Sequence, residues 1–324
     1  MPTAFITGAS GQDGSYLTER LLDEGVEVHA LQHAATSPSL DGRSWVDRVH
    51  WHHGDLVDSD GVRAVVADIA PDEIYNLAGV TSVAQSWQAP VLTAQVTAVG
   101  AVSIMQAAFE HTEKSGKPVR VLQPSSAEIF GSPDESPQRE TTTIRPTSPY
   151  GAAKAYAHTM ASVYRDRGLP VSTCILYNHE SPRRPVSFVT RKITRAAAAI
   201  SLGLAETVSL GNLDARRDWG WAPDYVEAMV AAARYEQGAD FVIATGRSHS
   251  VREFVAAAFA RAGVQDWESR VLVDPAFVRP ADPSELVGDA SKAAELLSWR
   301  PTVAFEDMVA AMVEADLVEL HTAG

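Results

Sequence analysis

AFITGASGQDGSYL, residues 4–17, is the stretch that decides the fold. Its first residues form an apolar run typical of a buried strand, and the helical spacing of leucines begins at Leu17. Between the two, Gly8, Gly11 and Gly14 follow a G-x-x-G-x-x-G spacing. Glycine permits a tight turn and a close approach to a pyrophosphate, which then faces the helix N-terminus. The stretch predicts a dinucleotide-binding loop; the alternative is an ordinary glycine-rich turn.

Outward from this loop, strands and helices alternate, as in a parallel sheet with helices on both faces. Strands are predicted at residues 3–7, 27–32, 49–53, 73–77, 119–124, 171–177 and 240–245, and helices near 14–24, 60–69, 91–113, 150–167 and 224–235. We expect an α/β fold, a Rossmann-type doubly wound parallel sheet with a smaller, mostly C-terminal substrate-binding domain. The expected dinucleotide-binding domain comprises residues 1–178 and about 212–246, and the smaller domain comprises about 179–211 and 247–324.

Composition narrows the partners and the compartment. The 324 residues are 45% hydrophobic and carry a formal net charge of -14 without a basic stripe, which argues against nucleic acid and anionic membranes as partners. The single cysteine, Cys174, lies in an apolar run, so we expect a buried thiol, no disulfide framework and no metal site. No signal peptide opens the chain and no apolar run approaches 18 residues. We expect a cytoplasmic protein.

Tyr150 and Lys154 form a candidate proton-transfer pair. A spacing of four residues places both side chains on one face of the helix predicted at 150–167. A phenol with a pKa of about 10 is a poor base near neutral pH, and a nearby ammonium favours its ionised form. Such a pair also arises by chance on helices. It gains meaning from the nucleotide-binding loop upstream in the same chain.

Four longer strings of residues are similar to those of a known protein family. They are SSAEIFG (125–131), YNHESPRR (177–184), FVTRKI (188–193) and LGNLDARRDWG (210–220). With the glycine motif and the Tyr150 and Lys154 pair, they make the chain resemble the extended short-chain dehydrogenases/reductases, and within them the GDP-mannose 4,6-dehydratases. The glycine motif and the Tyr/Lys pair indicate the superfamily, and the later strings indicate the family.

Glu128 decides which reaction the resemblance implies. A 4-epimerase or reductase needs no carboxylate beside the tyrosine, whereas a 4,6-dehydratase needs a base for the C5 proton once C4 is a ketone. Ser126 and Glu128 stand two residues apart after a strand, and on an extended segment they would point to the same side. An exposed loop carboxylate is the alternative. Ala127 stands where the dTDP-glucose type of dehydratase carries Asp, which favours the GDP-mannose type.

The resemblance implies that GDP-mannose becomes GDP-4-keto-6-deoxy-mannose. Tyr150 would take the proton of the C4 hydroxyl while hydride passes to the nicotinamide, and Ser126 would hold the developing ketone. Glu128 would remove the C5 proton and protonate the departing C6 hydroxyl, and hydride would return to C6. Lys154 would lower the pKa of Tyr150. Because the cofactor ends as it began, we expect it to stay tightly bound.

The remaining expected site residues are binding residues. For the cofactor they are Gly8, Gly11, Gln12, Asp13, Gly14, Asp55, Leu56, Leu77, Ala78, Tyr150, Lys154 and Arg43. For the sugar nucleotide they are Asn178, Glu180, Lys192, Arg217 and Arg279, with Arg183 and Arg184 as weaker candidates. His179 is expected either to order its loop or to contact the ligand. The resemblance implies NADP, but its usual Arg pair after the second strand is missing here, which leaves NAD as the alternative; Arg43 is the nearest substitute.

Three readings stay open at this point. One is a GDP-mannose 4,6-dehydratase or a dehydratase of another nucleotide sugar. The second is a 4-keto reductase or 4-epimerase on the same scaffold, against which Glu128 argues. The third is a non-catalytic Rossmann sensor, which the complete set of Ser126, Tyr150 and Lys154 disfavours. The resemblance also implies a homodimer or homotetramer, paired through helices such as 91–113 and 150–167.

Overall fold

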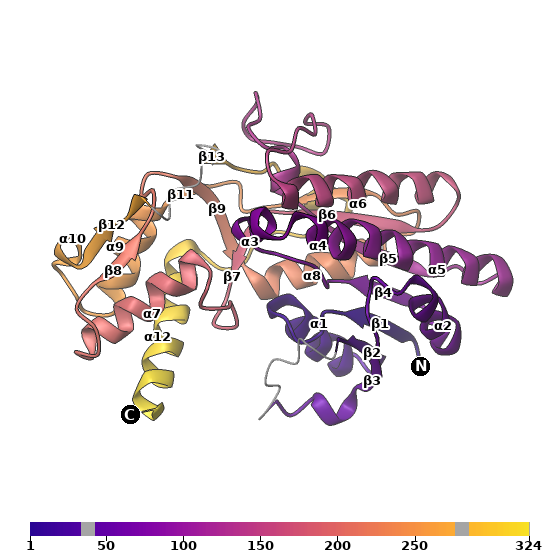
Figure 1. The fold of residues 1–324 in the computed structure, drawn as a ribbon, viewed down its shortest axis with the longest axis horizontal. Coiled ribbons are helices and arrows are strands. Elements are labelled where there is room, and N and C mark those ends of the chain that lie inside the picture. Colours follow the sequence, from indigo (N-terminus) through magenta and orange to yellow (C-terminus); the bar gives the residue numbers. More distant parts are fainter. Residues whose placement is uncertain (34–42, 276–284, 324) are drawn as a thin grey trace.

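The computed structural model describes residues 1–33, 43–275 and 285–323. Its largest element is a seven-stranded parallel sheet in the order β10-β6-β5-β4-β1-β2-β3 (Figure 1). The strands are β1 (Thr3–Thr7), β2 (Glu27–Gln32), β3 (His50–His53), β4 (Glu73–Asn76), β5 (Arg120–Ser126), β6 (Val171–Leu176) and β10 (Asp240–Ile243). Each lies within two residues of its predicted bounds. The order reverses between β1 and β4, where such sheets bind their ligands.

Helices cover both faces of this sheet, because β1 directs apolar side chains alternately to one face and the other. Ala4 and Ile6 pack into one apolar cluster with α1 (Gln12–Asp23) and α8 (Ala222–Ala233), and Phe5 packs into another on the opposite face. That second face is covered by α2 (Ser59–Ile69), α5 (Gly100–Ser115) and α6 (Pro149–Asp166). The predicted doubly wound arrangement is confirmed.

The predicted helix 91–113 is a helical segment in three parts. These are α4 (Pro90–Thr93), a π-helical turn η2 (Ala94–Val99) and α5, preceded by the short α3 (Val83–Gln88). By length and composition the segment Pro90–Ser115 is apolar enough to cross a membrane, but 56% of its most apolar stretch is buried inside the fold. It packs against α2 and α6 as a core helix of the sheet.

A second part of the molecule has its own apolar cluster. It contains α7 (Val189–Ser201), α9 (Val251–Arg261) and α12 (Phe305–Ala323), which lie to the left of the large sheet in Figure 1. Its second sheet contains β7 (Asn178–Glu180), β9 (Arg216–Trp221), β11 (Ser248–Ser250) and β13 (Glu285–Leu286), with β9 pairing the other three. The other described elements are β8 (Val208–Leu210), which pairs with β12 (Val271–Val273), η1 (Val46–Arg48), η3 (Ala127–Ile129), α10 (Trp267–Arg270) and α11 (Ser291–Leu296).

One expected boundary differs from the observed pairing. The range 212–246 was assigned to the dinucleotide-binding sheet, and within it α8 and β10 do join that sheet. β9, by contrast, pairs with β7, β11 and β13, and its Trp219 packs edge-to-face on Phe254 at a centroid distance of 5.2 Å. Residues 216–221 therefore belong to the second sheet. The sequence did not reveal this, because their strand partners are distant in sequence.

Candidate active site

The glycine loop forms a tight turn after β1 and packs against the residues that follow β4. Gly8 has φ +74°, in the left-handed region that favours glycine. A Cβ atom on Gly14 would lie 2.1 Å from the carbonyl oxygen of Gly8, and one on Gly8 would lie 2.8 Å from the backbone nitrogen of Ala78. Gly11 is the N-cap residue of α1. The predicted strand-to-helix turn is confirmed, and it lies where the strand order reverses; its contact with a cofactor stays a prediction.

The remaining expected cofactor residues are spread along the same edge of the sheet. Leu77 and Ala78 follow β4 and approach Gly8. Asp55 follows β3, where its carboxylate lies 3.2 Å from the Nε2 atom of His33, and Leu56 is buried in the cluster with α2 and α5. Burial and the nearby charge of Arg183 lower the pKa of Arg43. These residues surround the carboxyl ends of β1 to β4.

The helix α6 begins with a side-chain cap that positions its first turn. Ser148 is the N-cap residue, and its Oγ accepts a hydrogen bond of 3.0 Å from the backbone nitrogen of Gly151. A Cβ on Gly151 would lie 2.5 Å from the carbonyl oxygen of Glu128, so glycine lets α6 approach the end of β5. Tyr150, in this first turn, donates its backbone N–H to the hydroxyl of Ser86 at 3.2 Å. Lys154 lies one turn further and is 8% exposed.

Ser126 and Glu128 meet Tyr150, but not on an extended segment. The chain after β5 turns at once into the 3-10 helix η3, and the backbone nitrogen of Glu128 donates to the Oγ of Ser126 at 3.3 Å. The expectation of an extended segment was wrong, because Ser126 caps a helical turn instead. Hydrogen bonding with Ser126 and the charge of Glu128 both act on the phenol of Tyr150. The turn, rather than strand alternation, brings the three side chains together.

The electrostatics of the pair differ from the expectation. Burial raises the pKa of Tyr150 to about 12; hydrogen bonding with Ser126 opposes this shift, and the charge of Glu128 adds to it. Burial lowers the pKa of Lys154 to about 8. The Nζ atom of Lys154 donates to the carbonyl oxygen of Pro124 at 3.0 Å. The predicted lowering of the Tyr150 pKa is not found, because burial of the phenolate outweighs the hydrogen bond with Ser126 and the charge of Arg184, which both lower the pKa.

Gln12 and Asp13 connect the glycine loop to β7. Asp13 accepts a hydrogen bond of 2.9 Å from the Nε2 atom of His179, while the His179 Nδ1 atom lies 2.7 Å from the carbonyl oxygen of Tyr177. The amide of Gln12 donates to the carbonyl oxygen of His179 at 3.1 Å and accepts from the hydroxyl of Ser181 at 2.9 Å. His179 therefore orders its loop, the first of its two expected roles.

Arg184, a weaker candidate from the sequence, is charged and lies beside a buried carboxylate. Its Nε atom lies 3.2 Å from a carboxylate oxygen of Glu180, whose residue is 0% exposed, and its guanidinium lies 3.8 Å from the ring centroid of Phe188. Its charge lowers the pKa of both Tyr150 and Asp13, although burial raises both more strongly. Its position four residues after Glu180 was the available sequence signal. Arg184 is a cation at the centre of the cluster.

Glu180 carries a buried oxygen without a protein partner. Thr190 donates to its Oε2 atom at 2.7 Å, while its Oε1 atom has no hydrogen-bond partner among the described residues. Burial raises its pKa above the usual value, against the charge of Arg184. An unsatisfied buried oxygen beside a cation is a plausible contact for a donor on a ligand.

The other expected substrate residues are less concentrated. Asn178 begins β7, two residues beyond the end of β6. Lys192 lies in the first turn of α7, and Arg217 lies on β9, where it is 7% exposed and donates to the carbonyl oxygen of Arg216. Arg279 lies outside the described residues. The structure thus brings Asn178 and Glu180 to the edge that carries Tyr150 and places Lys192 and Arg217 on neighbouring elements.

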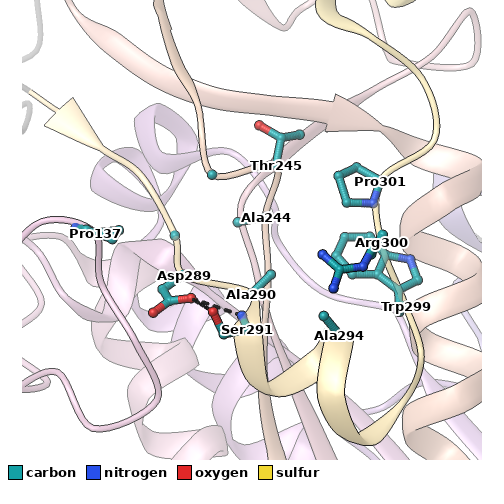
Figure 2. Close-up of a pocket in the computed structure, with 12 residues that line it drawn as sticks. Pro137, Ala244, Thr245, Asp289, Ala290, Ser291, Ala294, Trp299, Arg300 and Pro301 are labelled. Atoms are coloured by element: carbon teal, nitrogen blue, oxygen red, sulfur yellow. Dashed lines mark hydrogen bonds between the residues drawn. The ribbon is translucent and has the colours of Figure 1, made fainter.

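Two cavities are formed by other residues. One, of about 320 Å³, is lined by Thr245, Ser291, Trp299 and Arg300 among others, beyond the end of β10 (Figure 2). The other, of about 520 Å³, is enclosed by the polar loop between η3 and α6, including Arg139 and Arg145. Neither is lined by Ser126, Glu128, Tyr150 or Lys154. The candidate active site rests on the side-chain cluster and not on these cavities.

Known proteins resemble the chain over nearly its whole length. A sequence model of the family described as GDP-mannose 4,6 dehydratase matches residues 5–312. GDP-mannose 4,6 dehydratase 1 of Arabidopsis thaliana is 44% identical, over 97% of this chain and 89% of that protein. The GDP-mannose 4,6 dehydratase of Homo sapiens is 41% identical, over 98% of this chain and 92% of that protein.

A solved structure shares the fold. The UDP-glucose 4-epimerase of Thermus thermophilus, in complex with NAD, superposes with a TM-score of 0.83 at 28% identity, over 97% of this chain and 98% of that one. This epimerase shares the fold described above. The relatives with the higher identities of 41% and 44% are named as dehydratases. The family match spans all the elements that carry Ser126, Glu128, Tyr150 and Lys154, and the chain belongs to the GDP-mannose 4,6-dehydratase family.

Proposed function

We propose that this chain converts GDP-mannose to GDP-4-keto-6-deoxy-mannose by oxidation at C4, elimination of water across C5 and C6, and return of hydride to C6. The observation that carries the proposal is the meeting of Ser126, Glu128 and Tyr150 at the end of β5 and the start of α6. A reductase or epimerase of this fold would need the hydroxyl and the phenol but not the carboxylate. The family to which the chain belongs supports the same reaction.

The residues at the switch point fit a nicotinamide dinucleotide, which the family uses. A Cβ on Gly8 or Gly14 would collide with neighbouring backbone, so glycine at these positions permits the tight turn that leads into α1. The backbone N–H groups at the start of α1 would then face a pyrophosphate. Asp55 and Leu56 would flank the adenine, and Leu77 and Ala78 the neighbouring ribose and nicotinamide. When bound, the cofactor accepts hydride from C4 and returns it to C6.

We assign tightly bound NADP(H) as the cofactor, with NAD as the alternative. The charge of Arg183 adds to burial in lowering the pKa of Arg43, and Arg183 also donates to Ser15 and Glu19. A phosphate between two guanidinium groups would offset their repulsion and accept hydrogen bonds from both. This pair takes the place of the Arg pair that the family usually carries after the second strand.

The roles of the catalytic side chains follow from their protonation states. At neutral pH the phenol of Tyr150 holds its proton in this structure, because burial raises its pKa to about 12. It becomes a base for the C4 hydroxyl only when a positive charge lies beside it, as Lys154 and an oxidised nicotinamide would provide. Ser126 donates to the forming ketone oxygen. Glu128, half-buried in η3, takes the C5 proton and gives it to the C6 hydroxyl, which leaves as water. Once hydride has returned to C6, C5 takes up the proton that Tyr150 accepted from the C4 hydroxyl, after its exchange with solvent.

We assign the sugar nucleotide to β7 and its neighbouring elements. Arg184 suits the diphosphate because a guanidinium bonds two oxygens at once, and Asn178, Glu180, Lys192, Arg217 and Arg279 supply further donors and acceptors. The cofactor would therefore lie on the seven-stranded sheet, and the substrate would lie between that sheet and the part built on β7, β9 and α7. This division replaces the expected boundary at residue 212.

The assembly and compartment belong to the same proposal. Large apolar side chains are exposed on the segment 90–115 and on α6: Val91, Leu92, Val99, Tyr156 and Val163. Pairing of these helices in a homodimer, or twice in a homotetramer, would bury them. We place the protein in the cytoplasm, where nucleotide sugars are made.

The proposal is tested by incubating the purified protein with GDP-mannose and measuring the mass of the nucleotide sugar. A product lighter by one water, whose carbonyl forms an oxime, is the expected result. A product of unchanged mass would instead favour a 4-epimerase. Loss of water only from dTDP-glucose or UDP-glucose would assign the chain to another nucleotide sugar. No product with bound cofactor intact would favour the sensor.

A further inference from the structure

A compact group of imidazole and carboxylate side chains lies far along the sheet from the glycine loop. Glu27 and His29 are the first and third residues of β2, and His50 is the first residue of β3. His29 lies directly opposite His50 in the parallel register, so all three side chains project from the same face. They lie at the amino ends of their strands, whereas the candidate active site lies at the carboxyl ends.

The distances within this group match a metal-binding geometry. The Nε2 atom of His29 lies 3.4 Å from the Oε1 atom of Glu27, and the Nε2 atom of His50 lies 3.5 Å from the same oxygen. In a tetrahedral zinc site with bonds of about 2.0–2.2 Å, two ligand atoms are about 3.3–3.6 Å apart. All three ligand atoms lie within 4.8 Å of one another. Each of the two imidazole nitrogens thus already lies at this spacing from the shared carboxylate oxygen.

His52 completes the arrangement by orienting His29. The Nδ1 atom of His29 and the Nε2 atom of His52 are 2.8 Å apart, and the two rings stack with centroids 5.1 Å apart. A metal-binding histidine almost always donates its second ring N–H to a neighbouring acceptor, which fixes the tautomer. If the Nδ1–H of His29 donates to His52, the lone pair of its Nε2 atom points toward Glu27. This is the tautomer that a metal ion requires.

We propose that Glu27, His29 and His50 bind one divalent transition-metal ion of the zinc class, with water completing the coordination. Two imidazoles and one carboxylate suit zinc, and also copper or nickel, far better than magnesium or calcium, which prefer oxygen ligands. Such an ion would link the edge strand β3 to β2. The single cysteine gave no sign of a metal site, and the register that joins residues 27–29 to residue 50 appears only in the folded chain.

Calorimetric titration of tag-free, chelator-treated protein with zinc chloride tests the proposal. The wild type should bind one zinc ion per chain. Glu27→Gln and His50→Ala should each weaken binding at least tenfold, and His52→Ala, which removes the orienting partner, by about tenfold to a hundredfold. His53→Ala is the matched control: it removes an exposed histidine from the same strand but not from the cluster, and it should bind zinc as the wild type does.

Three results would overturn the proposal. They are binding without saturation at one zinc ion per chain, unchanged affinity in Glu27→Gln or His50→Ala, and an equal loss in His53→Ala. Thermal unfolding of each variant without metal shows whether it is folded, and these exposed or half-exposed positions should leave the unfolding midpoint unchanged. Conversion of GDP-mannose is a separate measurement, so failure here leaves the proposed reaction untouched.

Discussion

The ion pair of Asp13 and His179 should hold the glycine loop against β7 with a strength that depends on pH. Both ring nitrogens of His179 face acceptors, Asp13 through Nε2 and the carbonyl oxygen of Tyr177 through Nδ1. A neutral imidazole has one N–H and can donate only once, so the geometry requires the charged ring. Although burial opposes it, the carboxylate of Asp13 raises the pKa of His179 above its usual value. Asp13→Asn removes this charge and keeps the size.

The magnitude follows from distance and burial. At 2.9 Å, two unit charges attract by about 6 kcal/mol at an effective dielectric constant of about 20, which is an upper limit before desolvation. The side chains of His179 and Asp13 are 10% and 23% exposed. Breaking a buried pair costs about 3–5 kcal/mol, and the partial exposure of Asp13 reduces this. We expect Asp13→Asn to lower the free energy of unfolding by about 2–3 kcal/mol at about pH 6.

The sign of the pH dependence is fixed by the direction of the shift. Because the pKa of folded His179 is raised, its contribution to stability is fully present below its unfolded pKa of about 6.5 and is lost as pH rises through the folded value. The pKa of Asp13 is lowered by His179 against the opposing effect of burial, so its contribution is lost only in acid. The difference between wild type and Asp13→Asn should therefore shrink to about 1 kcal/mol at about pH 9.

Urea unfolding at the two pH values, read by circular dichroism, measures this difference. Asp214→Asn is the matched control, because Asp214 pairs with Arg252 at 3.0 Å on the surface, with 78% and 50% of the side chains exposed. It should change stability by no more than about 0.5 kcal/mol at either pH. The reasoning is refuted if Asp13→Asn behaves like Asp214→Asn, or if its cost grows as pH rises.

Three further predictions concern the site itself. Tyr150→Phe should lower kcat for GDP-mannose by about 10²–10⁴-fold with cofactor affinity retained; loss of cofactor affinity at equal kcat would contradict the assigned role. Gly14→Ala places a Cβ 2.1 Å from the Gly8 carbonyl oxygen, so it should cost about 1–3 kcal/mol in urea unfolding and empty the cofactor site, whereas Gly11→Ala, at 3.3 Å, should do much less; equal effects would disprove the packing argument. Arg184→Gln leaves the carboxylate of Glu180 buried without its cation and should lower unfolding stability by about 3 kcal/mol in urea, and a neutral result would mean that Glu180 is protonated in the wild type.

Local sequence patterns predicted the strands of the large sheet, but they could not predict which strands pair when the partners are distant in sequence. The alternation of Ala4, Phe5 and Ile6 is a property of the strand itself, so β1 and its neighbours could be placed from periodicity. The strand at 216–221 mixes charged and apolar residues, and its partners, β7, β11 and β13, come from three other regions of the chain. Nothing within residues 216–221 says which sheet they join, so the domain boundary was misplaced.

The site residues were predictable from their chemistry, and their geometry was not. Ser126 and Glu128 were proposed from the reaction that they would serve. The argument that joined them assumed an extended chain, whereas the chain forms the 3-10 turn η3 directly after Ser126. The raised pKa of Tyr150 depends on burial, which no motif reports. Arg184 and the histidine cluster on β2 and β3 become visible only when strand register and loop packing are known.

The central claim is that Glu128 is the base that distinguishes this site from that of an epimerase. The most direct measurement is the mass of the product formed from GDP-mannose in deuterated water by wild type, Glu128→Gln and the exposed control Glu113→Gln. Wild type and Glu113→Gln should give a product that has lost one water and gained one deuterium at C5, and Glu128→Gln should be slower by about 10²–10⁴-fold in both changes. Water loss and deuterium uptake by Glu128→Gln at the wild-type rate would contradict the account.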